Sequence, residues 1–103
     1  MSNALIFPEF DYLRNEVARL EDALYSGKLD GSPLHDVYLY QYTAAELILK
    51  AFYDEAGSPI DILEQIAKRW DIQSTYDPAT SYMFSTMRDY ALSLYDDILV
   101  WSV

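Results

Sequence analysis

Apolar residues recur every three or four positions in the first quarter of the chain: Phe10, Leu13, Val17, Leu20 and Leu24. Charged residues fill most of the positions between them. This spacing is typical of an α-helix with one apolar face. Pro8 suits the first helical turn, where its missing N–H costs nothing, and Gly27 suits the position just past a helix end. The pattern therefore predicts a helix over residues 8–26.

The tripeptide Gly-Ser-Pro occurs twice, at residues 31–33 and 57–59. Its order suits a helix stop followed by a helix start, because glycine ends one segment, serine caps the next and proline presets φ at the first position. The sequences after the two tripeptides are unrelated, so we interpret them as punctuation and not as an internal repeat. Asp77 and Pro78 form a third cap-and-start pair. These signals predict three further helices, over residues 33–56, 59–71 and 78–101.

Four helices joined by short loops predict an all-α fold, a small up-down four-helix bundle forming a single helical domain over residues 1–103. With 103 residues, of which 51 % are hydrophobic, the chain can bury one core without disulfides or metal. Ser2, Asn3 and Ala4 resemble the remnant of a cleaved expression tag, so residues 1–4 are given no functional weight.

The second and fourth predicted helices are apolar on more than one side. Besides its main stripe, the second helix carries another that includes Val37, Tyr40, Ala44 and Ile48, and the fourth helix is similarly broad near Tyr95. A helix that is apolar on most sides is either central or faces a partner as well as its own core. We therefore predict a candidate interface formed by Val37, Tyr40, Ala44, Ile48 and Tyr95.

A second copy of the chain is the simplest cover for this second stripe, since most soluble oligomers are symmetric dimers. Tyr40 and Val37 are the expected contacts, and Tyr40→Glu is expected to halve the dimer mass without unfolding the chain. The alternative is that Leu5, Ile6 and Phe7 fold back over the stripe within one chain. Light scattering distinguishes the two, because a monomeric mass at all concentrations leaves the amino-terminal segment as the cover.

The charge of the chain narrows the choice of partner. It has 17 acidic and 7 basic residues, a formal net charge of −10. Phosphate backbones and anionic lipids repel such a surface, so we expect no nucleic-acid partner and no membrane partner. Residues 65–72 resemble the first helix and turn of a helix-turn-helix, but Asp77 and Pro78 interrupt the second helix. The simplest interpretation of the negative charge is that it keeps the chain soluble. The more specific interpretation is that the acidic surface docks on a basic protein.

Groups that could carry catalysis are scarce. The chain has no cysteine and one histidine, His35, so it lacks the Glu-x-x-His pairs of di-iron bundles and the Cys/His sets of zinc sites. His35 is interpreted as an exposed or locally bonded residue. Adjacent carboxylates such as Asp96 and Asp97 point about 100° apart on a helix and do not converge. We predict no catalytic residue, metal, cofactor or enzymatic activity, and rank last an enzyme whose carboxylates come from different helices.

Ten tyrosines are the most unusual feature of the composition. Tyrosine combines a large apolar ring with a polar tip, which suits interfaces and half-buried positions. With the acidity, they predict a small non-enzymatic protein-interaction module, in its sharper form an inhibitor of the immunity or antitoxin type that covers a basic partner. The alternative is a homo-oligomeric structural or regulatory bundle. The lack of cysteine, of a run of about 20 apolar residues and of a secretory leader favours a cytoplasmic location.

Overall fold

The computed structural model describes the backbone of residues 8–102 and the side chains of residues 8–100. This part of the chain forms four helices: α1 (Pro8–Tyr25), α2 (Leu34–Asp54), α3 (Pro59–Gln73) and α4 (Pro78–Ser102). The predicted all-α, four-helix fold is confirmed, and every predicted helix end lies within two residues of the observed one.

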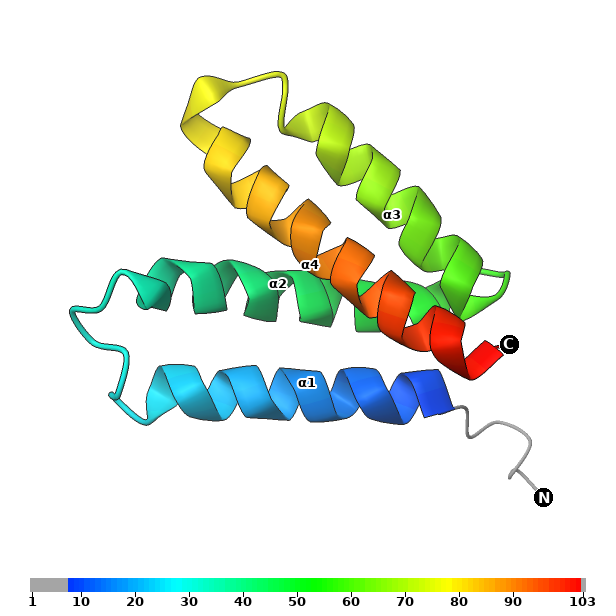
Figure 1. The fold of residues 1–103 in the computed structure, drawn as a ribbon, viewed down its shortest axis with the longest axis horizontal. Coiled ribbons are helices and arrows are strands. Elements are labelled where there is room, and N and C mark those ends of the chain that lie inside the picture. The colour runs from blue at the N-terminus through cyan, green and yellow to red at the C-terminus, as the bar shows by residue number, and fades with distance from the viewer. Residues whose placement is uncertain (1–7, 103) are drawn as a thin grey trace.

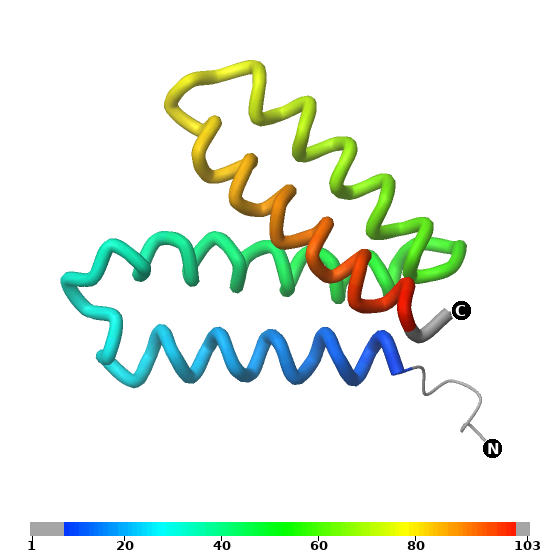
Figure 2. Tube along the Cα trace, viewed as in Figure 1, coloured from blue at the N-terminus to red at the C-terminus, as the bar shows by residue number. Residues whose placement is uncertain are grey.

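The four helices are arranged as two antiparallel hairpins that cross obliquely (Figure 1). The first hairpin is α1–α2 and the second is α3–α4, and α2 packs against α1, α3 and α4. The two hairpins separate toward their turns, so that the α1–α2 turn and the α3–α4 turn lie apart (Figure 2). The bundle is therefore a crossed pair of hairpins in which α2 is the central helix.

One core joins both hairpins. Its largest fully buried side chains come from all four helices: Leu13, Leu20, Ile48, Leu63, Leu94 and Ile98. Aromatic rings extend this core at one end of α1, where the ring of Phe10 lies 5.6 Å from that of Phe52 and 4.9 Å from that of Tyr53. Burial of this aliphatic and aromatic surface is the main force that holds the hairpins together.

The second Gly-Ser-Pro acts as the sequence predicts. Gly57 has φ 118°, a conformation that residues with a Cβ rarely adopt. The Ser58 hydroxyl accepts a hydrogen bond from the Asp61 N–H at 3.3 Å, and Pro59 begins α3. The residue order thus encodes a helix stop and a helix start within three positions.

The first Gly-Ser-Pro works through a tighter turn. The Ser32 hydroxyl accepts a hydrogen bond from the Leu34 N–H at 3.1 Å, and its carbonyl accepts one from the His35 N–H at 3.1 Å. Pro33 has helical φ and ψ but is the capping residue, so α2 begins at Leu34, one residue later than predicted. The third signal is confirmed, because Asp77 Oδ1 accepts a hydrogen bond from the Ala79 N–H at 2.9 Å.

Removing the Ser58 cap should destabilise the chain. Ser58→Ala is expected to lower the free energy of unfolding by about 1 kcal/mol, because the Asp61 N–H loses its acceptor. Chemical denaturation measures this change. Ser93→Ala is the matched control, since Ser93 is exposed within α4, where alanine is the better helix former. Equal midpoints for Ser58→Ala and the unmodified chain would show that the cap contributes nothing.

Candidate functional site

The five residues predicted as an interface do not form one exposed surface. Ala44 and Ile48 are fully buried in the chain's own core, so they cannot reach a partner while the fold is intact. Val37, Tyr40 and Tyr95 are half-buried, and both tyrosines pack against the core. The prediction for Ala44 and Ile48 is thereby corrected. Its physical reason is that the second apolar stripe of α2 faces the α3–α4 hairpin.

Tyr40 already has an aromatic neighbour within the chain. Its ring meets that of Tyr82 on α4 edge to face, with ring centroids 5.9 Å apart. Because the second hairpin covers this side of α2, the reason for expecting a second copy of the chain there no longer holds. The dimer itself stays a prediction, and the alternative cover, Leu5–Phe7, lies outside the described residues.

Polar side chains also join the two hairpins, along the contact between α1 and α4. The Tyr90 hydroxyl donates to Glu16 Oε1 at 2.7 Å, and Glu16 accepts two further hydrogen bonds from Arg19 at 3.0 and 3.1 Å. The Tyr12 hydroxyl donates to Asp97 Oδ2 at 2.6 Å. Sequence reasoning missed these pairs. The available signal was that Tyr12 and Glu16 lie four residues apart and Tyr90 and Asp97 seven apart, spacings that keep each pair on one helix face.

These contacts raise the pKa of the two tyrosines and lower the pKa of Glu16. Burial raises the pKa of the Tyr90 hydroxyl, and the hydrogen bond to Glu16 and that carboxylate's charge raise it further. Burial also raises the pKa of Glu16, but hydrogen bonds from Arg19 and Tyr90 and the Arg19 charge outweigh it, so the net pKa is lowered. Burial, followed by the hydrogen bond to Asp97, raises the pKa of Tyr12 to about 12. At neutral pH both tyrosines are therefore neutral, and each hydroxyl donates to a carboxylate oxygen.

The raised pKa of Tyr12 makes stability fall in alkali. Below about pH 10, Tyr12 is protonated in both the folded and unfolded chains, and its contribution is fully present. As pH rises through about 10 toward 12, the unfolded chain loses this proton first, so the contribution is lost. Tyr12→Phe and Asp97→Asn should each give a shallower alkaline decline of the unfolding midpoint than the unmodified chain. Parallel declines in all three proteins would contradict the assignment.

Most basic side chains are paired within the chain. Five of the seven form ion pairs with carboxylates: Arg14–Asp11, Arg19–Glu16, Lys50–Asp54, Arg69–Glu55 and Arg88 with both Asp71 and Asp89. Such surface pairs contribute little stability, typically below about 1 kcal/mol each. Their main consequence is electrostatic, because they leave the remaining carboxylates with few cations near them.

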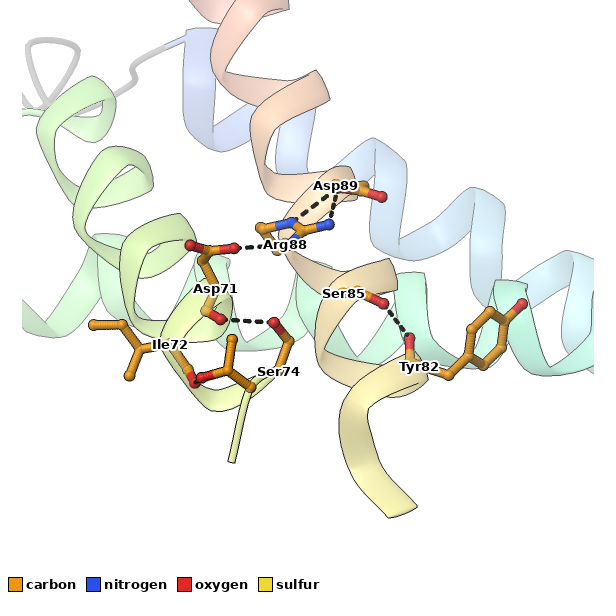
Figure 3. Close-up of polar contacts among 8 residues, drawn as sticks. Asp71, Ile72, Ser74, Tyr82, Ser85, Arg88 and Asp89 are labelled. Atoms are coloured by element: carbon orange, nitrogen blue, oxygen red, sulfur yellow. Dashed lines mark hydrogen bonds and ion pairs between the residues drawn. The ribbon is translucent and has the colours of Figure 1, made fainter. Parts of the chain in front are cut away.

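Among these ion pairs, Arg88 on α4 contacts two carboxylates, those of Asp71 on α3 and Asp89 on α4. Its Nη1 lies 2.7 Å from Asp71 Oδ1, and its Nη2 lies 2.9 Å from Asp89 Oδ1, so the guanidinium bridges the two helices (Figure 3). Below it, the hydroxyls of Ser74 and Thr75 donate to the carbonyls of Asp71 and Ile72 and help to satisfy the carboxyl end of α3. Exposed Ile72 and Tyr82 point to opposite sides in this view, so they do not form one patch (Figure 3).

In the part of the chain that the structure describes, grooves run between α2 and α3, between α1 and α2, and between α3 and α4. The α2–α3 groove, of about 270 Å³, is lined by Leu47, Ala51, Ile66 and Trp70 with the Lys50–Asp54 and Arg69–Glu55 pairs beside them. The α1–α2 groove, of about 310 Å³, lies beside Val17, Leu49 and Tyr53. The α3–α4 groove, of about 570 Å³, is lined by Glu64, Ala67, Lys68, Asp71, Arg88, Asp89 and Leu92. The last is the largest of the three.

Residues 8–102 hold no group of three or more His, Cys, Asp or Glu side chains close enough together to bind a metal ion. His35 lies in the first turn of α2, with its Nδ1 3.6 Å from the Asp36 carboxylate. None of the helices in the described part of the chain combines the length and apolar character that crossing a membrane requires.

No family model matches the chain, and no significant match was found among curated proteins or solved structures.

Proposed function

We propose that this chain is a non-enzymatic interaction module whose acidic surface binds a basic protein, in the manner of an immunity-type or antitoxin-type inhibitor. The observation that supports it is the intramolecular pairing of the cations. Five of the seven basic side chains are engaged by six of the seventeen carboxylates, which leaves two lysines and eleven carboxylates. The chain therefore carries a large excess of carboxylates that its own cations do not match, and a basic surface would complement this charge.

Exposed tyrosines support the same proposal. Tyr25, Tyr53, Tyr76 and Tyr82 are each between 58 and 79 % exposed. A large ring with a polar tip contributes contact area at a small cost in side-chain entropy, which is why tyrosine is enriched in protein interfaces. Binding of this kind needs shape and charge complementarity and no reacting groups.

Association with the basic partner should depend strongly on ionic strength. The partner is obtained by affinity capture from the native host and then purified, and the association rate constant is measured by stopped flow. Raising the salt from about 20 to about 150 mM should slow association by about tenfold or more, because long-range steering is screened. A rate that ignores salt over this range, or a purified partner with an acidic surface, would count against the proposal. So would tight binding of the chain to DNA.

A further inference from the structure

The groove between α2 and α3 has an apolar floor. Figure 1 shows α3 leaving α2 at an angle after the turn that joins them, and the groove, of about 270 Å³, lies in this angle. Four apolar residues line it: Leu47, Ala51, Ile66 and Trp70. Ala51 and Ile66 belong to the buried core, while Leu47 is 45 % exposed and Trp70 is half-buried. The groove thus continues the apolar core of the chain to its surface.

The charged residues of this groove are matched with one another. Lys50 Nζ lies 2.6 Å from Asp54 Oδ2, and Arg69 Nη2 lies 3.8 Å from Glu55 Oε2. These four are the remaining lining residues, so the formal charges around the groove cancel. An apolar group placed on the floor therefore displaces water from the neighbourhood of two ion pairs. It does not strand an isolated carboxylate, whose desolvation would be costly.

The other two grooves contain unmatched charges. Glu46 lines the α1–α2 groove, and Glu64 and Lys68 line the α3–α4 groove. Within the described residues, none of these three side chains takes part in an ion pair. An uncharged apolar group is therefore accommodated best in the α2–α3 groove.

We propose that the α2–α3 groove receives an uncharged apolar side chain, of the size of leucine or phenylalanine, from the basic partner. This inference rests on the proposed function and adds the contact that anchors the partner. The unmatched carboxylates elsewhere on the chain attract the cations of the partner, while the anchor contributes contact that does not depend on charge. A second copy of the chain is a poorer donor of this side chain, because two chains of net charge −10 repel each other.

Charge and anchor affect different rate constants. Charges at an interface mainly set the association rate, whereas a buried apolar contact mainly slows dissociation. Leu47→Asn, which leaves the net charge unchanged, should therefore raise the dissociation rate constant of the captured partner by about tenfold. It should not alter the dependence of association on salt. Leu92→Asn is the matched control, because Leu92 is 44 % exposed on α4 and lines the α3–α4 groove instead.

The groove is also tested without the partner, with N-acetylphenylalaninamide as an uncharged probe that carries an apolar side chain and peptide groups. Binding to the full chain is followed by the NMR signals of the Trp70 indole N–H and of the Leu47 and Arg69 amides. The probe should shift these signals with an affinity of about 1 mM. Salt between about 20 and about 150 mM should leave this affinity unchanged, because the probe is uncharged.

Two further probes control for the peptide groups and for charge. N-acetylglycinamide lacks the apolar side chain, and N-acetyllysinamide replaces it with a cation, so both should give weaker shifts. Leu47→Asn should reduce the shifts caused by the phenylalanine derivative, and Leu92→Asn should not. Unfolding midpoints establish that each variant is folded.

Several outcomes would overturn the groove assignment. These are equal shifts with the glycine or lysine derivative, the absence of shifts with all three probes, or equally fast dissociation of the partner from Leu47→Asn and Leu92→Asn. A change in the mass of the chain alone with Leu47→Asn would identify a second copy as the occupant. The probe experiment needs no partner, so its result stands whether or not association with the partner depends on salt, and the two proposals can fail separately.

Discussion

Replacing Ile48 with alanine should lower the free energy of unfolding by about 2–5 kcal/mol. Ile48 is fully buried in the central helix α2, where the α1–α2 and α3–α4 hairpins share one core. Truncation removes apolar contacts and leaves a cavity in the core cluster, to which both hairpins contribute residues. Because both hairpins share this core, the loss should appear as a lower denaturation midpoint for the whole fold.

Leu47→Ala is the matched control for this variant. Leu47 is the adjacent aliphatic residue on the same helix, but it is 45 % exposed, so its truncation should cost less than about 1 kcal/mol. The comparison also separates two roles for Ile48. If Ile48→Ala were as stable as Leu47→Ala but bound a partner or a second copy more weakly, Ile48 would be an interface residue and its placement in the core would be wrong.

Replacing Tyr90 with phenylalanine should cost about 1.5–3 kcal/mol, the range for hydrogen bonds to charged groups. Tyr90 is 7 % exposed, and its hydroxyl donates to the carboxylate of Glu16, whose side chain is 15 % exposed. Removing the hydroxyl leaves a poorly solvated carboxylate with Arg19 as its remaining hydrogen-bond donor. The ring remains, so the apolar contacts of α4 with the core are kept.

Tyr42→Phe is the control for the Tyr90 variant. The Tyr42 hydroxyl also donates to a carboxylate, that of Glu21, at 3.1 Å, but the contact is exposed and water can replace it. A double-mutant cycle of Tyr90→Phe with Glu16→Gln isolates the coupling between the two side chains. A coupling energy near zero, or equal losses in Tyr90→Phe and Tyr42→Phe, would show that this contact does not join the hairpins.

The helix ends could be predicted from the sequence because their signals are local. A cap, a preset φ and a left-handed glycine act over about four residues, as Ser58 and Gly57 do at the start of α3. The one-sided pattern of α1 correctly predicted Leu13 and Leu20 as buried, since a helix with one apolar stripe has only one way to face a core.

The broad apolar pattern of α2 was ambiguous, because a helix with two apolar stripes has more than one way to face its neighbours. Two apolar stripes are equally consistent with a central helix and with a helix that faces a partner, and the prediction chose the partner. Only the tertiary structure decides the matter, because α3 and α4 pack against α2, and Ala44 and Ile48 are buried in the core that all four helices share. Tyr40 is half-buried and meets Tyr82.

Sequence alone therefore determined the fold class, the number of helices and nearly all of their ends, together with the net charge that directs the search for a partner. The tertiary structure decided which apolar stripes of the four helices pack against each other. It also created the contacts between Tyr12 and Asp97 and between Glu16 and Tyr90, which lie 85 and 74 residues apart in the sequence. Helix spacing describes one helix at a time. The pairing of faces depends on how two hairpins pack, and this is set by the sum of many contacts between residues that are distant in the chain.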